Sequence, residues 1–246
     1  MQPNLQTSEH NNGIDRGQQN GAARGASLLL IWLSPSFPVG AFAYSHGLET
    51  AVAKELVHDR QSLTEWLDDL VRGGAPRNDM ILMALAWDSV AREDHKAFDE
   101  MNDLAIALQP SSERKLETVA QGNAFMAAAT AAWPAPKMDG FIGKRDIDMA
   151  YPMAVALASA AHGVARHDTL NAYGIAFVGN LISAAIRLGV IGQTDGQRIQ
   201  ATLLPLVATT ARQLEFAGLD DLGGATWMSD LCAMQHEIQH TRLFRS

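Results

Sequence analysis

The sequence contains almost no cysteine and no concentrated positive charge. Cys232 is the only cysteine in 246 residues, so an intrachain disulfide is impossible, and the composition is compatible with a reducing cytosol. The formal net charge is −8, and no run of Lys or Arg is longer than a pair. A nucleic-acid-binding surface needs a basic stripe to neutralise phosphates. The composition therefore argues against a nucleic-acid partner.

Long hydrophobic runs are also missing. The most apolar stretches, residues 149–165 and 171–186, fall short of the roughly 20 apolar residues that span a bilayer. A shorter run, Ser27–Leu33, resembles a signal-peptide core, and Ala41-Phe42-Ala43 resembles a cleavage site. Prolines follow that run directly, however, and the segment before it is not strongly positive. We therefore expect a cytoplasmic chain without a membrane partner.

Alternation of polar and apolar residues, which would indicate strands, is not convincing anywhere, whereas helical spacing recurs from Ser27 onward. Ser62 and Glu65 are spaced as a capping box, and Asp168 is expected to cap a helix that ends near Leu188. The prolines and glycines of residues 134–145 predict a loop. The predicted fold class is all-α, a single-domain bundle of about eight to ten helices.

The beginning of the chain has a different composition. Residues 1–25 are rich in Asn, Gln and Gly and contain few large apolar side chains. Such a segment buries too little surface to offset the entropy lost on ordering. We predict a disordered N-terminal arm over residues 1–25 and an all-helical domain over residues 26–246.

One motif suggests catalysis. His236-Glu237-Ile238-Gln239-His240 matches H-E-x-x-H, which on a helix can place two imidazoles on a zinc ion and a general base beside them. A catalytic zinc site needs a third protein ligand, and residues 241–246 contain no His, Asp or Glu. We treat a zinc metallopeptidase as the alternative function.

Other catalytic patterns are incomplete. The S-x-x-K at Ser112–Lys115 lacks its companion motifs. Gly143-Lys144 lacks the upstream glycine of a phosphate-binding loop, so no GTP site is expected. The residues alone thus predict a protein that is not an enzyme and that has no cofactor or metal of its own.

Three separated stretches carry a resemblance to a known family. The first is Leu28–Glu49, LLLIWLSPSFPVGAFAYSHGLE; the second is Tyr151–Gln197, which includes FVGNLISAAIRLGVIGQTDGQ; the third is the ending MQHEIQHTRLFRS. A weaker match lies at Glu113–Gly122 and includes Arg114, Glu117 and Gln121. In combination these stretches resemble the urease accessory protein UreF family. Ala41, Ala156 and His240 depart from the residues expected there.

The resemblance implies an adaptor that acts through other proteins. The resemblance implies a homodimer that works as a nickel-insertion chaperone in urease maturation. The implied partners are a UreD/UreH-type accessory protein, a UreG-type GTPase and the urease apoprotein, and nickel and GTP would be ligands of those partners. A free-standing helical oligomer is a further reading, but it would not explain the ordered motifs.

The resemblance also suggests partner-binding residues. Lys115 and Arg187 could reach a partner's nucleotide as an arginine finger does, although Arg187 could instead pair with an internal carboxylate. Leu243 and Phe244, between two arginines, are expected to form a partner-binding tail, with burial of Phe244 in its own core as the alternative. The full set of candidates is Pro38, Gly40, Phe42, Tyr44, Ser45, Gly47, Glu49, Lys115, Arg187, Gln193, Asp195, His236, Glu237, Arg242, Leu243 and Phe244.

Overall fold

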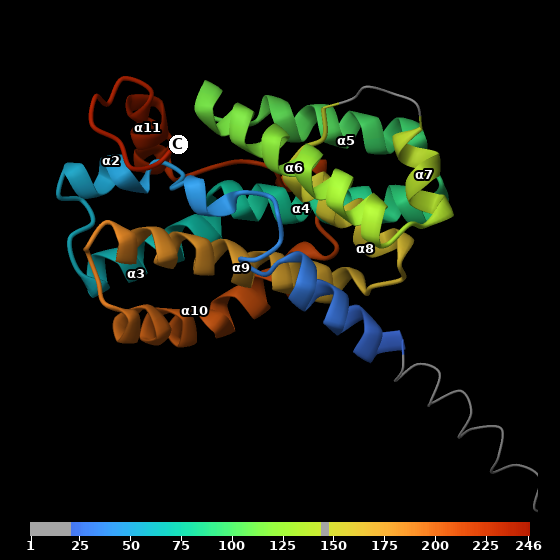
Figure 1. Cartoon of the computed structure of the whole chain (residues 1–246), viewed down its shortest axis with the longest axis horizontal. Helices are drawn as coiled ribbons and strands as arrows, with labels where there is room; N and C mark the ends of the chain where they lie inside the picture. The colour runs from blue at the N-terminus through green and yellow to red at the C-terminus, as the bar shows by residue number, and fades with distance from the viewer. Residues whose placement is uncertain (1–20, 144–147) are drawn as a thin grey trace, which may run out of the picture.

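The computed structural model describes residues 21–143 and 148–246, and this part of the chain is helical and contains no strand (Figure 1). A helical segment at residues 21–32 comes first. The elements that follow are η1 (Ala41–Ala43), α2 (Leu48–Ala53), α3 (Arg60–Gly73), α4 (Ala75–Arg92), α5 (His95–Ala107), α6 (Ser112–Ala132), α7 (Pro136–Ile142), α8 (Tyr151–Ala161), α9 (Arg166–Arg187), α10 (Gln193–Leu214), η2 (Leu219–Asp221) and α11 (Trp227–His236). The predicted all-α fold is confirmed.

Several helix boundaries follow from local sequence. The Ser111 hydroxyl accepts the backbone N–H of Arg114 at the start of α6. The capping box of α3 was predicted wrongly. Asp59 is the N-cap, and its carboxylate accepts the backbone N–H of Ser62, while the Ser62 hydroxyl accepts the backbone N–H of Asp59. Asp168 lies in the first turn of α9 and does not cap it.

Two predicted segment assignments need correction. The expected loop at residues 134–145 contains α7. Pro136 suits the first turn of this helix, and its Met138 and Phe141 side chains are buried in the core. The predicted arm ends too late, since residues 21–25 are already helical and Gly25 lies against Val164. Residues 1–20 lie outside the described residues, so the arm stays a prediction there.

The larger apolar core surrounds α8, which packs against α4 on one side and α6 on the other. Every α8 residue from Pro152 to Ser159 is buried. The approach is close because the contacting residues are small. A Cβ atom on Gly122 of α6 would lie 1.9 Å from the carbonyl oxygen of Met149, just before α8. Shape complementarity of small side chains therefore sets the geometry of this core.

A second apolar cluster joins α2, α3, α9, α10 and α11. In Figure 1, α9 lies between α10 and the layer of α4, α6 and α8, while α2 and α11 lie side by side at one end of the bundle. Among the described helices, only α9 is long and apolar enough to cross a bilayer by length and composition. Half of its apolar window is buried within the fold, as in the core helix of a bundle.

Candidate functional site

Glu49, in the first turn of α2, connects this helix to the end of α11 and to the segment after α11. Its carboxylate accepts the backbone N–H groups of Leu243 and Phe244 at 2.6 and 2.9 Å. The same carboxylate lies 3.1 Å from Nε2 of His236, which is fully buried at the end of α11. Nδ1 of His236 lies 2.6 Å from Glu113 on α6, and Glu113 also binds Arg242. Buried charge therefore fastens the segment after α11 onto α2 and α6.

Glu117, one turn further along α6, is a second buried carboxylate with several partners. It pairs with Arg114 on the same helix and lies 2.9 Å from Nε2 of His46. It also accepts hydrogen bonds from the Gln121 amide at 2.9 Å and the Ser246 hydroxyl at 2.6 Å. We call Glu49, Glu113, Arg114, Glu117, His236 and Arg242 the charged cluster.

The pKa values show which charges this cluster stabilises. Burial alone would raise the pKa of Glu117, but Arg114, His46 and the Ser246 hydroxyl outweigh it and lower that pKa to about 2. Burial and the nearby Arg114 lower the pKa of His46, and Glu117 only partly opposes them. At neutral pH, the center of the cluster is therefore an ionised Glu117–Arg114 pair beside a neutral His46.

The loop before α2 is held by the same segment that Glu49 binds. The hydroxyl and backbone N–H of Ser45 both donate to the backbone oxygen of Ser246, at 2.6 and 2.7 Å. The backbone N–H of Arg245 donates to the Ala43 carbonyl at 2.8 Å. Arg187 of α9 donates to the Phe42 carbonyl, and its guanidinium lies 4.4 Å from the Phe244 ring centre. Arg187 thus has internal partners, but neither is the carboxylate considered above.

Glycines allow this tight arrangement. Gly40 and Gly47 have φ angles of 73° and 77°, in the left-handed region that favours glycine. A Cβ atom on Gly47 would lie 2.6 Å from the backbone nitrogen of Ala233 in α11. The Gly47 position therefore sets how closely α2 approaches α11.

The H-E-x-x-H residues are arranged differently from a zinc site. α11 ends at His236, so the two histidines do not share one helical face. His236 directs both ring nitrogens at carboxylates, while His240 is exposed. Glu237 accepts the backbone N–H of Ser112 at 2.7 Å, at the start of α6, and hydrogen bonds from Ser112 lower the Glu237 pKa. In residues 21–143 and 148–246, no group of three or more His, Cys, Asp or Glu side chains is placed to hold a metal ion.

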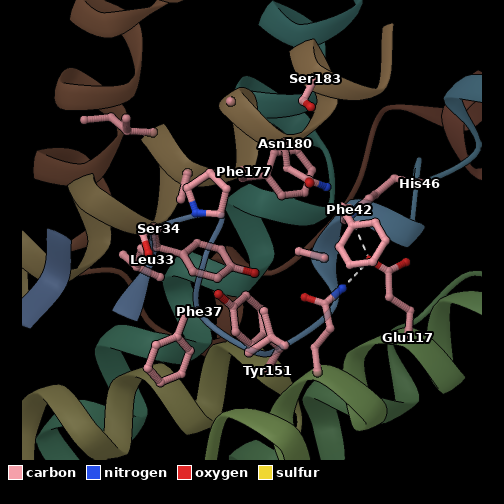
Figure 2. Close-up of a pocket in the computed structure, with 18 of the residues that line it drawn as sticks. Leu33, Ser34, Phe37, Phe42, His46, Glu117, Tyr151, Phe177, Asn180 and Ser183 are labelled. Atoms are coloured by element: carbon pink, nitrogen blue, oxygen red, sulfur yellow. Dashed lines mark hydrogen bonds and ion pairs between the residues drawn. The ribbon is translucent and has the colours of Figure 1, made fainter. Parts of the chain in front are cut away.

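A cavity of about 350 Å³ lies beside the charged cluster, bounded by the loop before α2 and by α4, α6, α8 and α9 (Figure 2). Aromatic side chains line much of it, among them Phe37, Tyr151, Tyr173 and Phe177. Asp79 of α4 also lines the cavity, and its carboxylate accepts the Tyr173 hydroxyl at 2.7 Å. Burial raises the pKa of Asp79 to about 6, against the opposing effects of Tyr173 and Arg114.

An exposed apolar face runs along α11. The side chains of Trp227, Leu231 and Met234 recur at helical spacing, and Ile238 follows just beyond the helix; they are between 47% and 79% exposed. The opposite side of α11 is buried against the chain's own core through Cys232, Ala233 and other residues. We call Trp227, Leu231, Met234 and Ile238 the α11 face. A contiguous exposed apolar patch of this kind commonly marks an interaction site.

The structure brings together many of the residues proposed from the sequence, but not all of them. Phe42, Ser45, Glu49, Arg187 and His236 gather around the segment that holds Arg242, Leu243 and Phe244, and buried Tyr44 lies in the adjoining loop with Gly40, Gly47 and exposed Pro38. Glu237 binds Ser112 at the start of α6. Gln193 and Asp195 instead lie in the first turn of α10, where Asp195 pairs with Arg60 and Arg198. Lys115 is exposed on α6.

Phe244 and Leu243 differ in exposure. Phe244 is buried in its own chain, which was the alternative considered for the tail, whereas Leu243 is 54% exposed. The cavity residues Asp79 and Tyr173 were missed, because a single Asp or Tyr within an apolar helix carries no pattern. The charges at positions 113, 114 and 117 were visible as part of the weaker match, but their burial was not.

Comparisons with known proteins agree with these motifs. The sequence model of the UreF family matches residues 57–204. The urease accessory protein UreF of Methylorubrum populi is 50% identical over 218 residues, which cover 89% of this chain and 97% of that relative. The protein of the same name from Xanthobacter autotrophicus is 49% identical, covering 89% and 90%. That from Azorhizobium caulinodans is 46% identical over 228 residues, covering 93% and 98%.

Proposed function

The chain belongs to the UreF family of urease accessory proteins, and on that basis we propose that it acts in urease maturation as a non-catalytic adaptor. In this proposal it serves as a nickel-insertion chaperone within a complex of a UreD/UreH-type protein, a UreG-type GTPase and the urease apoprotein. It acts in the cytoplasm as a homodimer, and nickel and GTP are bound by its partners.

The observation that carries this proposal is the α11 face. Trp227 and Ile238 are 74% and 79% exposed on an element whose other side is already packed into the fold. Covering such side chains removes apolar surface from water, which favours association. Leu243 adds further exposed apolar surface, and Arg242 is of a residue type that is enriched among those dominating interface energies.

Adaptor work also fits the chemistry of the charged cluster. Each of its carboxylates has partners within the chain, and His236 bridges two of them. Such a cluster positions segments and leaves no free nucleophile or base beside a substrate. A protein of this kind can still favour one state of a GTPase by binding that state more tightly. Exposed Lys115 is the residue we propose for contact with an anionic group of a partner.

A pair of matched variants tests the proposal. Leu231→Ser changes the α11 face, and Leu204→Ser changes a residue of nearly equal exposure on α10, 46% against 47%. Each variant is co-expressed with apo-urease and the accessory partners, and urease activity and complex formation are measured. We expect Leu231→Ser to reduce both while helicity and melting temperature stay close to normal, with Leu204→Ser unchanged. Full activation by Leu231→Ser combined with Ile238→Ser would contradict the proposed role of this face.

A further inference from the structure

The cavity beside the charged cluster combines a buried carboxylate with aromatic walls. Asp79 is only 6% exposed, and within the described residues its hydrogen-bond partner is the Tyr173 hydroxyl. The Tyr151 and Tyr173 ring centres are 5.9 Å apart, and Phe37 and Phe177 line the same space. In Figure 2, Phe37, Tyr151 and Phe177 lie around the space, and Phe42 lies on the side of Glu117 and His46. Phe42 is 68% exposed, which places it at the mouth of the cavity.

Among the described residues that line the cavity, the charges sum to a negative value at neutral pH. Arg114 and Glu117 form an ion pair and offset each other. Burial lowers the pKa of His46, which leaves its ring neutral. Burial raises the pKa values of Tyr151 and Tyr173, so both hydroxyls stay protonated. Asp79, with a pKa of about 6, is the remaining ionised group above that pH.

We propose that this cavity binds a small organic ammonium ion, either as a free amine or as the head of a lysine side chain from a partner. A cation over aromatic faces is attracted by the ring quadrupole, and the attraction grows when the site is shielded from water. Asp79 supplies the opposite charge, and Tyr173 orients that carboxylate by donating to it. The volume of about 350 Å³ is at the lower end of small-molecule sites.

Tetramethylammonium is the first probe because it stays charged at every pH, and tert-butanol is its neutral counterpart of similar shape. Calorimetry on the full chain at pH 7.5 should detect binding of tetramethylammonium and much weaker binding of tert-butanol. At pH 5, about one unit below the Asp79 pKa, most of this carboxyl group is protonated, and the affinity for tetramethylammonium should fall by up to about tenfold. Equal binding of the two probes, or unchanged affinity at pH 5, would overturn the proposal.

Two variants with the same change of charge locate the site. Asp79→Asn removes the buried charge and should weaken tetramethylammonium binding at least about tenfold. Asp69→Asn removes an exposed charge on α3 and should leave the affinity unchanged. Circular dichroism shows whether both variants fold. If Asp79→Asn does not fold, Tyr173→Phe, which keeps the aromatic wall, tests the same site. Undiminished affinity in both cavity variants would place the cation elsewhere.

An assay of complex formation distinguishes the two sources of the ammonium group. If a partner's lysine is the ligand, tetramethylammonium should compete with assembly of the accessory complex, and Asp79→Asn should weaken that assembly. If a free amine is the ligand, the probe should bind while assembly is unaffected. Because calorimetry needs no partner, failure of the α11 experiment and failure of this one are distinguishable.

Discussion

The two halves of α6 are held in the fold by different interactions. Its first turns carry Glu113, Arg114 and Glu117, whose charged and polar partners lie on α6 itself, in the loop before α2, on α11 and in the segment after α11. Its later turns carry Gly122 and Phe125, which pack closely against α8 and the residues just before it, where Asn123 also accepts the backbone N–H of Met149. One helix thus joins a region that depends on paired charge to a region that depends on close contact. The two regions should respond differently to substitution.

The largest effect is expected from breaking the buried ion pair. Arg114→Met leaves Glu117 buried without its strongest opposite charge. Removing one partner of such a pair costs about 3–5 kcal/mol of unfolding free energy, measurable by urea denaturation. The double variant Arg114→Met with Glu117→Gln should recover part of this loss, because no uncompensated charge remains. Equal loss in the single and double variants would mean that packing, and not charge, holds this half of α6.

A smaller loss is expected in the close-packed half. Gly122→Ala places a methyl group where a Cβ would meet the Met149 carbonyl oxygen at 1.9 Å, so α6 and α8 must separate. Overpacking of this kind costs about 1–3 kcal/mol. Gly140→Ala is the control, because among the described residues a Cβ there meets only a His95 ring carbon at 3.9 Å. Similar melting temperatures for the two variants would show that the α6–α8 contact is looser than described.

Asp79 of α4 lines the cavity beside the charged cluster, and removing its charge is expected to increase the free energy of unfolding. Its pKa in the folded chain is about 6, above the usual 3.8, so the folded state binds more protons between these values. Stability from this group is therefore greatest below about pH 4 and is lost as pH rises through about 6. Asp79→Asn is neutral at every pH and can still accept from Tyr173. We expect it to be more stable than the native chain by about 1–3 kcal/mol at pH 7.5.

The measurement for Asp79→Asn is the difference in unfolding free energy from the native chain across pH 4–8. That difference isolates Asp79, because other acid-sensitive groups such as Glu117 are common to both chains. A flat difference would show that Asp79 titrates normally and that its surroundings are well hydrated.

The smallest effect is expected at the edge of the charged cluster. Glu237→Gln removes a charge from the start of α6 but keeps an oxygen that can accept from Ser112. Negative charge at a helix N-terminus contributes about 0.3–1 kcal/mol, so the melting temperature should fall only slightly. The same variant should show no loss of peptidase activity and no loss of bound zinc. A peptidase activity that depends on Glu237 would support the metallopeptidase alternative.

The sequence predicts those features that depend on a few neighbouring residues. The start of α6 at Ser112 and the end of α3 at Gly73 were predictable, because caps and helix-ending glycines act over a few residues. α7 was missed because proline and glycine mark both loops and helix ends. The site was predicted in part. Glu49 and His236 were selected through family motifs, but their contact joins residues 187 positions apart, and no local pattern encodes it. Asp79 was missed for the same reason.

The hydrogen bonds between Ser45 and Ser246 have a consequence for folding kinetics. They connect residues 201 positions apart, and closing so long a loop is entropically unfavourable until other contacts have shortened it. Helices such as α3 and α4 can form and pair early through local contacts. Glu49 and Glu117 gain their contacts with residues 243–246 only when this long chain loop closes. Closure of the loop between Ser45 and Ser246 is therefore expected to be a late step of folding. Until then, the Glu49 and Glu117 carboxylates lack part of their stabilisation.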